Sequence, residues 1–149
     1  MEATFGKIIS FAIEKEKEAA ELYKNLSGLV KKSNTKIMFN ELAEEEVKHR
    51  EFLEGITGEK VPDLPLREVT DLKISDYLVD VSFKPDMEYQ DILIMAMKRE
   101  ESSVKLYNDM ATKVKNTELQ KLLKFMAQEE AKHKLRLETE YDENILRED

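Results

Sequence analysis

A glutamate precedes a histidine by three residues at two places in the chain, Glu46 with His49 and Glu130 with His133, and these are its only two histidines. Residues three apart lie on the same face of a helix. Di-metal carboxylate sites in four-helix bundles take one such pair from each of two helices and one inward glutamate from each of the other two. The sequence therefore predicts a two-metal site if two more helices each supply a glutamate.

An internal repeat supplies the two remaining glutamates, Glu16 and Glu100. Adding 84 to the residue numbers 16, 46 and 49 gives 100, 130 and 133, and no gap is needed. The same offset relates Tyr23 to Tyr107. The chain is therefore predicted to be a duplicated helix hairpin that carries two equivalent sets of ligands.

Four carboxylates in the interior of a bundle cannot all stay charged and unpaired, because the removal of each ion from water costs several kcal/mol. Two divalent ions would balance the four charges, and the histidines would add neutral nitrogen donors. This donor set favours iron and also admits manganese or zinc. The expected ligands are Glu16, Glu46 and His49 for one ion and Glu100, Glu130 and His133 for the other, with Glu46 and Glu130 as candidate bridges. A metal-free bundle with protonated interior carboxylates is the alternative.

Two tyrosines share a helix face with the predicted ligands. Tyr23 and Tyr107 follow Glu16 and Glu100 by seven residues, which is two helical turns. Each could be an aromatic residue of the core, or its hydroxyl could hydrogen-bond a ligand carboxylate. Both alternatives stay open, and the second makes the two tyrosines candidate catalytic residues.

Apolar residues recur at spacings of three and four in four long segments, which predicts helices over residues 4–29, 34–55, 87–113 and 117–141. Ser33 or Asn34, Asp86 and Asn116 are the expected caps of the last three helices. Residues 57–85 contain all three prolines and are expected to form a crossover with one short helical turn near Ser75. The predicted fold is all-α: a single domain over residues 1–149, in which two helix hairpins form an antiparallel four-helix bundle.

The composition narrows the range of partners. The net charge is −8 without a basic cluster, which argues against nucleic acid or an anionic membrane surface as partner. No signal peptide or membrane-length apolar run is present, so we expect a cytoplasmic protein. Ile8, Phe11 and Phe52 lie off the predicted helix seams and favour a homodimer. A tail that frays is expected after Tyr141.

The ligand motifs resemble those of the ferritin-like di-iron carboxylate superfamily, and within it the rubrerythrin family. The matching motifs are Glu16-x-x-Ala19-x-x-x-Tyr23, Glu46-x-x-His49, Glu100-x-x-Ser103-x-x-x-Tyr107 and Glu130-x-x-His133. The resemblance implies a ferritin-like bundle with two iron ions, and a homodimer or larger oligomer. It also implies reduction of hydrogen peroxide to water or oxidation of Fe(II), as part of a response to oxidative stress.

The sequence departs from the rubrerythrin pattern at two points. It contains no cysteine, so it has no iron site of the rubredoxin type, and electrons would come from a separate donor such as a rubredoxin-type protein. Position 103 is a serine, whereas rubrerythrins carry an additional glutamate there. These departures keep a second reading open, in which the chain is a non-enzymatic protein that binds or handles iron.

Overall fold

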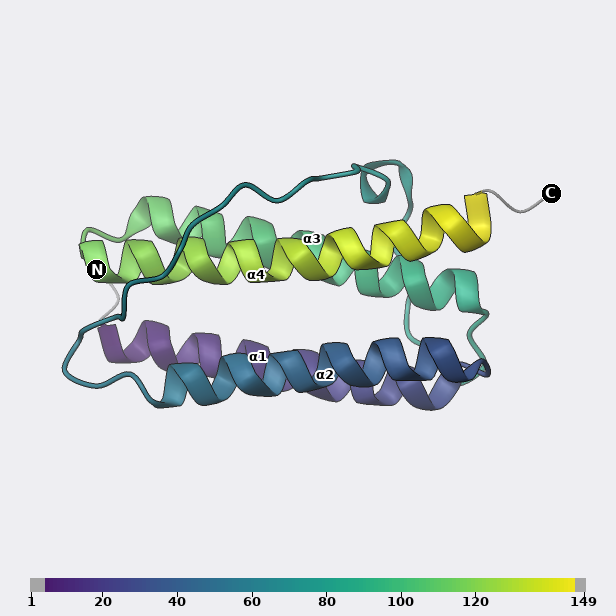
Figure 1. The fold of residues 1–149 in the computed structure, drawn as a ribbon, viewed down its shortest axis with the longest axis horizontal. Coiled ribbons are helices and arrows are strands. Elements are labelled where there is room, and N and C mark those ends of the chain that lie inside the picture. Colours follow the sequence, from purple (N-terminus) through teal and green to yellow (C-terminus); the bar gives the residue numbers. More distant parts are fainter. Residues whose placement is uncertain (1–4, 147–149) are drawn as a thin grey trace. The chain divides into compact units, whose positions relative to one another are not determined.

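Long helices account for most of the residues that the computed structural model describes, which are residues 5–146 (Figure 1). No strand occurs among these residues. The fold class is therefore all-α, as predicted, and is consistent with a ferritin-like four-helix bundle. The elements are, in order, α1 (Phe5–Leu29), α2 (Ser33–Glu54), the 3₁₀ turn η1 (Ser75–Tyr77), α3 (Tyr89–Lys113), α4 (Thr117–Tyr141) and the π-helical turn η2 (Asp142–Leu146).

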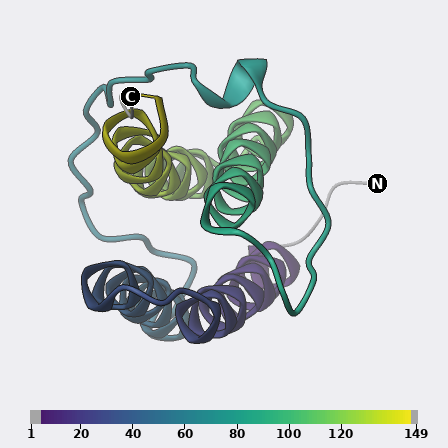
Figure 2. The ribbon, with the colours of Figure 1, turned by 90° about the vertical axis from the view of Figure 1, so that its right-hand side faces the viewer.

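The chain divides into two compact units, Met1–Pro62 and Asp63–Asp149. The first contains α1 and α2, which lie side by side and form the first hairpin (Figure 2). The second contains the crossover together with α3 and α4, which form the second hairpin. Within each hairpin a short connection makes the two helices antiparallel neighbours, as the sequence predicted.

The first hairpin buries one stripe of each helix. The stripe on α1 follows spacings of three and four: Ile8, Ala12, Glu16, Ala19, Tyr23 and Leu26. The ring of Tyr23 stacks on Phe39 of α2, with 6.1 Å between the ring centroids. Ile8 was expected on the surface but is 3% exposed, because it lies one helical turn before Ala12 and extends the buried stripe. Phe11 is exposed, as predicted.

The second hairpin buries a wider face than the first. One stripe of α4 follows spacings of three and four and is buried at every position: Leu119, Leu123, Met126, Glu130, His133 and Leu137. In addition, α4 buries Lys134 and Glu138, which lie outside this stripe. No helix among residues 5–146 combines the length and the apolar character that a membrane span requires.

The helix ends agree with the sequence only in part. The side chain of Asn116 accepts a hydrogen bond from the Leu119 N–H at 3.1 Å, so the predicted cap of α4 is confirmed. Asp86 does not cap α3, because Pro85 and Asp86 form a turn and the helix begins at Tyr89. At the N-terminus of α2 the cap residue is Lys32, without a side-chain hydrogen bond. Residues 142–146 continue as η2 where fraying was expected, and the rest of that tail, residues 147–149, lies outside the described residues.

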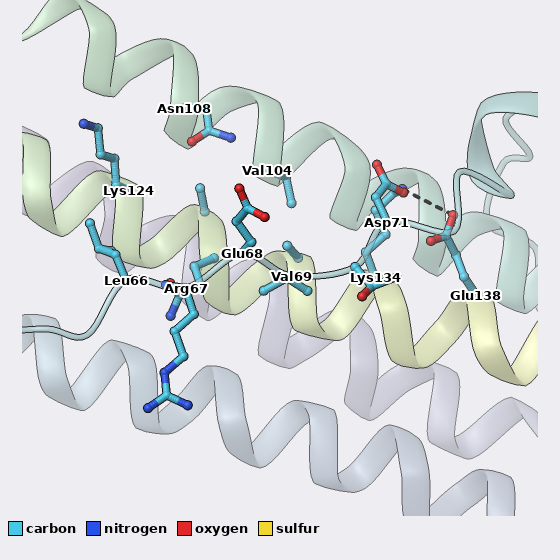
Figure 3. A pocket seen from close by; sticks show the side chains of 14 residues that line it. Leu66, Arg67, Glu68, Val69, Asp71, Val104, Asn108, Lys124, Lys134 and Glu138 are labelled. Atoms are coloured by element: carbon cyan, nitrogen blue, oxygen red, sulfur yellow. Dashed lines mark hydrogen bonds and ion pairs between the residues drawn. The ribbon is translucent and has the colours of Figure 1, made fainter.

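Residues 65–71 of the crossover lie over the α3–α4 face, and we call them the strap (Figure 3). Gln128 of α4 holds the strap backbone, because its side-chain oxygen accepts a hydrogen bond from the Arg67 N–H. Its amide nitrogen donates to the Pro65 carbonyl at 3.1 Å. Further along, Lys134 Nζ lies 2.6 Å from Asp71 Oδ1 and 3.2 Å from Glu138 Oε2. The strap is thus fixed by a backbone clamp and by a charged contact.

The contact between Lys134 and Asp71 favours the ionised form of both side chains. Burial alone would lower the pKa of Lys134, but hydrogen bonds and charges from Asp71 and Glu138 raise that pKa above its ordinary value. Burial would also raise the pKa of Asp71, yet the Lys134 ammonium and the Lys73 N–H lower it. The Ser75 N–H donates to Glu138 Oε2 at 2.9 Å, so the buried carboxylate has a second donor.

Candidate metal centre

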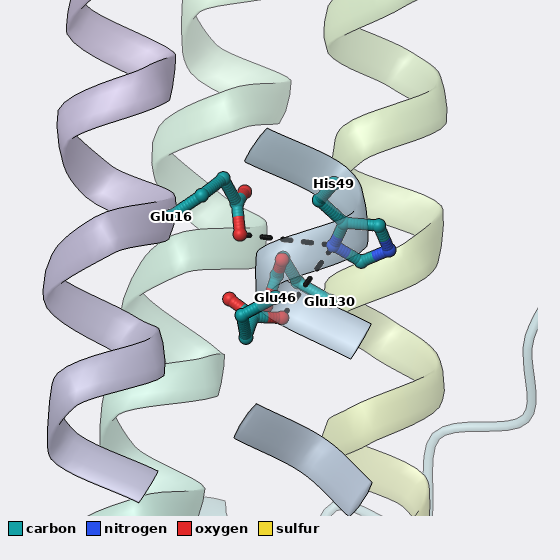
Figure 4. A group of neighbouring side chains, drawn as sticks. All are labelled: Glu16, Glu46, His49 and Glu130. Carbon is teal, nitrogen blue, oxygen red and sulfur yellow. Dashed lines mark ion pairs between the residues drawn. The ribbon is translucent and has the colours of Figure 1, made fainter. Parts of the chain in front are cut away.

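The first cluster of predicted ligands consists of Glu16 on α1 with Glu46 and His49 on α2, and these side chains point toward one another (Figure 4). His49 Nδ1 lies 3.7 Å from Glu16 Oε2 and 3.5 Å from Glu46 Oε1. Both glutamates are buried, and the His49 side chain is 15% exposed. The structure therefore brings together the three residues that the sequence assigned to one ion.

The second cluster repeats this arrangement with Glu100 on α3 and with Glu130 and His133 on α4. His133 Nδ1 lies 4.0 Å from Glu100 Oε1 and 3.5 Å from Glu130 Oε2. All three side chains are buried. Each hairpin thus supplies two carboxylates and one imidazole in the same pattern, as the offset of 84 residues predicted.

Helix periodicity explains why these side chains meet. Glu46 and His49 are three residues apart and so project from one face of α2. Leu42 and Leu53 continue this face and are 0% exposed, which fixes it toward the interior. Burial of the polar residues within such an apolar stripe requires a partner for their charges.

The spacing of the donor atoms fits a cation. Within each cluster, one ligand atom from each of the three residues lies within 4.8 Å of the others. The histidine-to-carboxylate distances of 3.5–4.0 Å exceed the length of a good hydrogen bond. An ion with bonds of about 2.0–2.2 Å holds adjacent ligand atoms roughly 3–3.5 Å apart, so small side-chain rotations would complete the coordination. Two carboxylates and one neutral imidazole suit one divalent iron, manganese or zinc ion.

The two candidate catalytic tyrosines lie inside their hairpins. Tyr23 is 0% exposed and Tyr107 is 1% exposed. The Tyr23 ring stacks on Phe39, whereas the residue equivalent to Phe39 in the repeat is Leu123. The first tyrosine therefore has a clear packing role. Ser103, where the rubrerythrin pattern has a glutamate, is half-buried on α3.

The sequence did not reveal one buried carboxylate, Glu138. It is 0% exposed and receives hydrogen bonds from Lys134 and from the Ser75 N–H. The spacing of four residues between Lys134 and Glu138 could have indicated the ion pair. Its burial, however, depends on the crossover, whose path was not predictable from helix periodicity. This carboxylate belongs to the strap contact and not to either cluster.

A comparison with protein families identifies the chain directly. The rubrerythrin family model matches residues 7–88 and 91–149, which is nearly the whole sequence. No curated protein and no solved structure gives a significant match. The family match agrees with the resemblance drawn from the ligand motifs and with the all-α fold. The chain belongs to the rubrerythrin family.

Proposed function

We propose that the two clusters join in one centre that holds two iron ions, and that the protein is a di-iron oxidoreductase. The proposed ligands are Glu16, Glu46, His49, Glu100, Glu130 and His133. The observation that supports this most is the repetition of the same Glu-Glu-His cluster in both hairpins of a rubrerythrin-family chain. Manganese or zinc would fit the same donors.

In this proposal the protein supplies ligand geometry and charge balance. The four carboxylates carry a charge that two divalent ions neutralise, and Glu46 and Glu130 are the candidate bridging ligands. Two Fe(II) ions, each oxidised to Fe(III), would supply the two electrons that reduce one hydrogen peroxide, with two protons, to two waters. Burial of the carboxylates excludes bulk water from the donor atoms. The electrons for further turnovers would come from a separate donor protein.

The tyrosines are proposed to act on protons and on ligand orientation. Tyr23 and Tyr107 lie two helical turns beyond Glu16 and Glu100 on the same helices. A buried phenol can hold a carboxylate in one orientation or donate a proton to a reduced oxygen. Because Tyr23 also packs on Phe39, Tyr107 is the better candidate for the proton donor.

The test is anaerobic loading with two equivalents of Fe(II) per chain, followed by stopped-flow oxidation with hydrogen peroxide and, separately, with dioxygen. We expect peroxide to oxidise both ions faster than dioxygen does, and consumption of peroxide to continue when a chemical reductant is added. Absence of Fe(II) binding would refute the assignment of the ligands.

A matched pair of variants tests the ligand set itself. Glu130→Ala should lower the iron content from two ions to one per chain and abolish sustained turnover. Glu129→Ala makes the same change one residue earlier, where the carboxylate instead pairs with Lys132 at 2.7 Å. This control should keep both ions. Equal iron content in the two variants would contradict the proposed role of Glu130.

Ser103 favours a second candidate function, which is iron binding or iron transfer without sustained catalysis. Its hydroxyl cannot replace the negative charge of the glutamate that rubrerythrins carry at this position. Under this proposal, Fe(II) is oxidised once and turnover then stops with every reductant tested. In addition, removal of the iron by a chelator should lower the thermal stability, because metal binding contributes to folding. Continued consumption of peroxide would exclude this candidate.

A further inference from the structure

The internal repeat produces two equivalent surface grooves, one on each hairpin. The strap covers a groove of about 500 Å³ on the second hairpin, which we call the covered groove (Figure 3). A groove of about 650 Å³ on the first hairpin is lined, among the described residues, by α1 and α2 alone. We call it the open groove.

The two grooves are built from the same positions of the repeat. On α2 the open groove is lined by Asn40, Ala43, Glu44, Val47 and Arg50. Adding 84 to each number gives residues of α4 that line the covered groove: Lys124, Ala127, Gln128, Ala131 and Lys134. The same offset relates Ala20 and Lys24 of α1 to Val104 and Asn108 of α3. Both grooves therefore have a floor of small or β-branched apolar residues with polar edges.

The covered groove shows how such a surface binds an extended peptide. Leu66 and Val69, three residues apart in the strap, line it together with the apolar floor. Gln128 binds the strap backbone, and Lys134 binds Asp71. The open groove keeps a cation at the position of Lys134, where it has Arg50. At the position of Gln128, however, the open groove has Glu44.

The charges of the two grooves differ in sign. The α3 and α4 residues of the covered groove include Lys124, Lys134 and Glu138 as charged groups, which gives +1. The strap residues that line it carry Arg67, Glu68 and Asp71, which gives −1. The lining of the open groove has four acidic side chains and three basic ones, which gives −1: Glu14, Glu18, Glu21 and Glu44 with Lys17, Lys24 and Arg50. A strap-like ligand for the open groove should thus be net positive.

We propose that the open groove binds an extended peptide segment of a partner protein, with a net positive charge, two apolar side chains three residues apart and an acidic residue for Arg50. The apolar pair faces Ala43 and Val47, in the same way that Leu66 and Val69 line the covered groove opposite Ala127 and Ala131. The positive charges flank the acidic residue on both sides. At that end of the covered groove Ser75 contacts Glu101, whose repeat equivalent is Lys17. Lys17 pairs with Glu14 at 3.6 Å, and Glu18 is a second acidic residue of the groove lining there.

The probes are two fluorescent peptides with blocked ends. The first has the sequence of residues 63–73, DLPLREVTDLK, with a net charge of −1. The second replaces Thr70 and Leu72 of that peptide by lysine, which changes the net charge to +1 and keeps the counterparts of Leu66, Val69 and Asp71. We expect the basic peptide to bind the full-length protein about three- to tenfold more tightly, as two solvent-exposed ion pairs would provide. Its affinity should fall as salt is added.

Two exposed glutamates of α2 give a matched pair of protein variants. Glu44→Lys reverses a charge in the open groove and should weaken binding of the basic peptide severalfold. Glu41→Lys makes the same reversal three residues earlier, where the side chain does not line the groove, and should leave the affinity unchanged. Circular dichroism checks that both variants keep their fold, so the result does not depend on the metal chemistry.

Four outcomes would overturn the inference. The first is failure of both peptides to bind, and the second is equal affinity for the Glu44→Lys and Glu41→Lys variants. The third is tighter binding of the unmodified strap peptide together with groove-dependent self-association of the protein in sedimentation, which would make a second copy of the chain the occupant. Binding of a scrambled basic peptide with equal affinity would also overturn it, because only charge would then be recognised.

Discussion

Replacement of Lys134 by methionine should destabilise the second hairpin and release the strap. Lys134 is 6% exposed and is the cation shared by Asp71 and Glu138. Its removal leaves the fully buried Glu138 carboxylate with the hydrogen bond from the Ser75 N–H but without its cation. Loss of one member of a buried ion pair costs about 3–5 kcal/mol. Because Asp71 is half exposed and the Ser75 N–H stays in place, we expect about 3 kcal/mol, the lower end of that range.

The assay is urea unfolding of the metal-free protein, followed by circular dichroism, with thermal unfolding in parallel. The metal-free form is used because Lys134 follows His133 directly, and metal binding would otherwise add to the measured stability. A loss of 3 kcal/mol corresponds to a decrease in Tm of roughly 6–12 °C for a chain of this length. Addition of Glu138→Gln should recover about 2 kcal/mol, since it removes the buried charge and keeps an oxygen for the Ser75 N–H.

The repeat provides the control for this prediction. Arg50 is equivalent to Lys134, and it pairs with Glu54 at 3.6 Å as Lys134 pairs with Glu138. Both Arg50 and Glu54 are substantially solvent-exposed, so Arg50→Met should cost less than about 1 kcal/mol. Equal losses for the two methionine variants, or no recovery with Glu138→Gln, would show that burial beneath the strap does not determine the strength of the pair.

Three further predictions concern single side chains. Asn116→Ala removes the cap that accepts from the Leu119 N–H and should cost about 1 kcal/mol in urea unfolding. Tyr89 donates to Glu140 at 2.6 Å, and burial, with this hydrogen bond, raises the pKa of Tyr89 above 10.0. The stabilisation by this hydrogen bond is therefore complete below pH 10 and is lost as the pH rises. At pH 8 wild type should be more stable than Tyr89→Phe by about 1–2 kcal/mol. This difference should shrink above pH 10. A constant difference up to pH 12 would contradict this. Tyr107→Phe should keep both iron ions and slow oxidation by peroxide, and unchanged kinetics would remove its proposed role.

The six candidate ligands could be recognised from sequence because their positions follow from local geometry. A spacing of three residues fixes Glu46 beside His49 whatever the rest of the chain does. The pairing of Glu16 with them required only that the short connection after α1 make an antiparallel hairpin. Each cluster lies within one hairpin, so no long-range contact had to be predicted. The roles of Tyr23 and Tyr107 stay open from sequence. A tyrosine that packs in the core and one that hydrogen-bonds a ligand carboxylate would occupy the same helix face, so spacing does not distinguish them.

The parts that sequence did not predict depend on contacts distant in the chain. Lys134 and Glu138 are polar, and a helix pattern assigns such residues to solvent. They are buried because residues 71–75 of the crossover supply their partners, and a segment with three prolines and no periodicity gives no indication of its path. The start of α3 was misplaced for a related reason, because Pro85 and Asp86 suit a turn as well as a helix start.

The two halves of the chain differ at positions that line the two grooves. The candidate ligands are identical in both hairpins, and each meets the same types of side chain within its own hairpin. The groove positions have diverged: Gln128, which needs both a donor and an acceptor to hold the strap backbone, is Glu44 in the hairpin without a strap. A carboxylate accepts hydrogen bonds but cannot donate to a carbonyl. If a strap-like ligand does occupy the open groove, it must therefore present an N–H or a cation at that point, and Glu44→Gln should improve binding of the unmodified strap peptide.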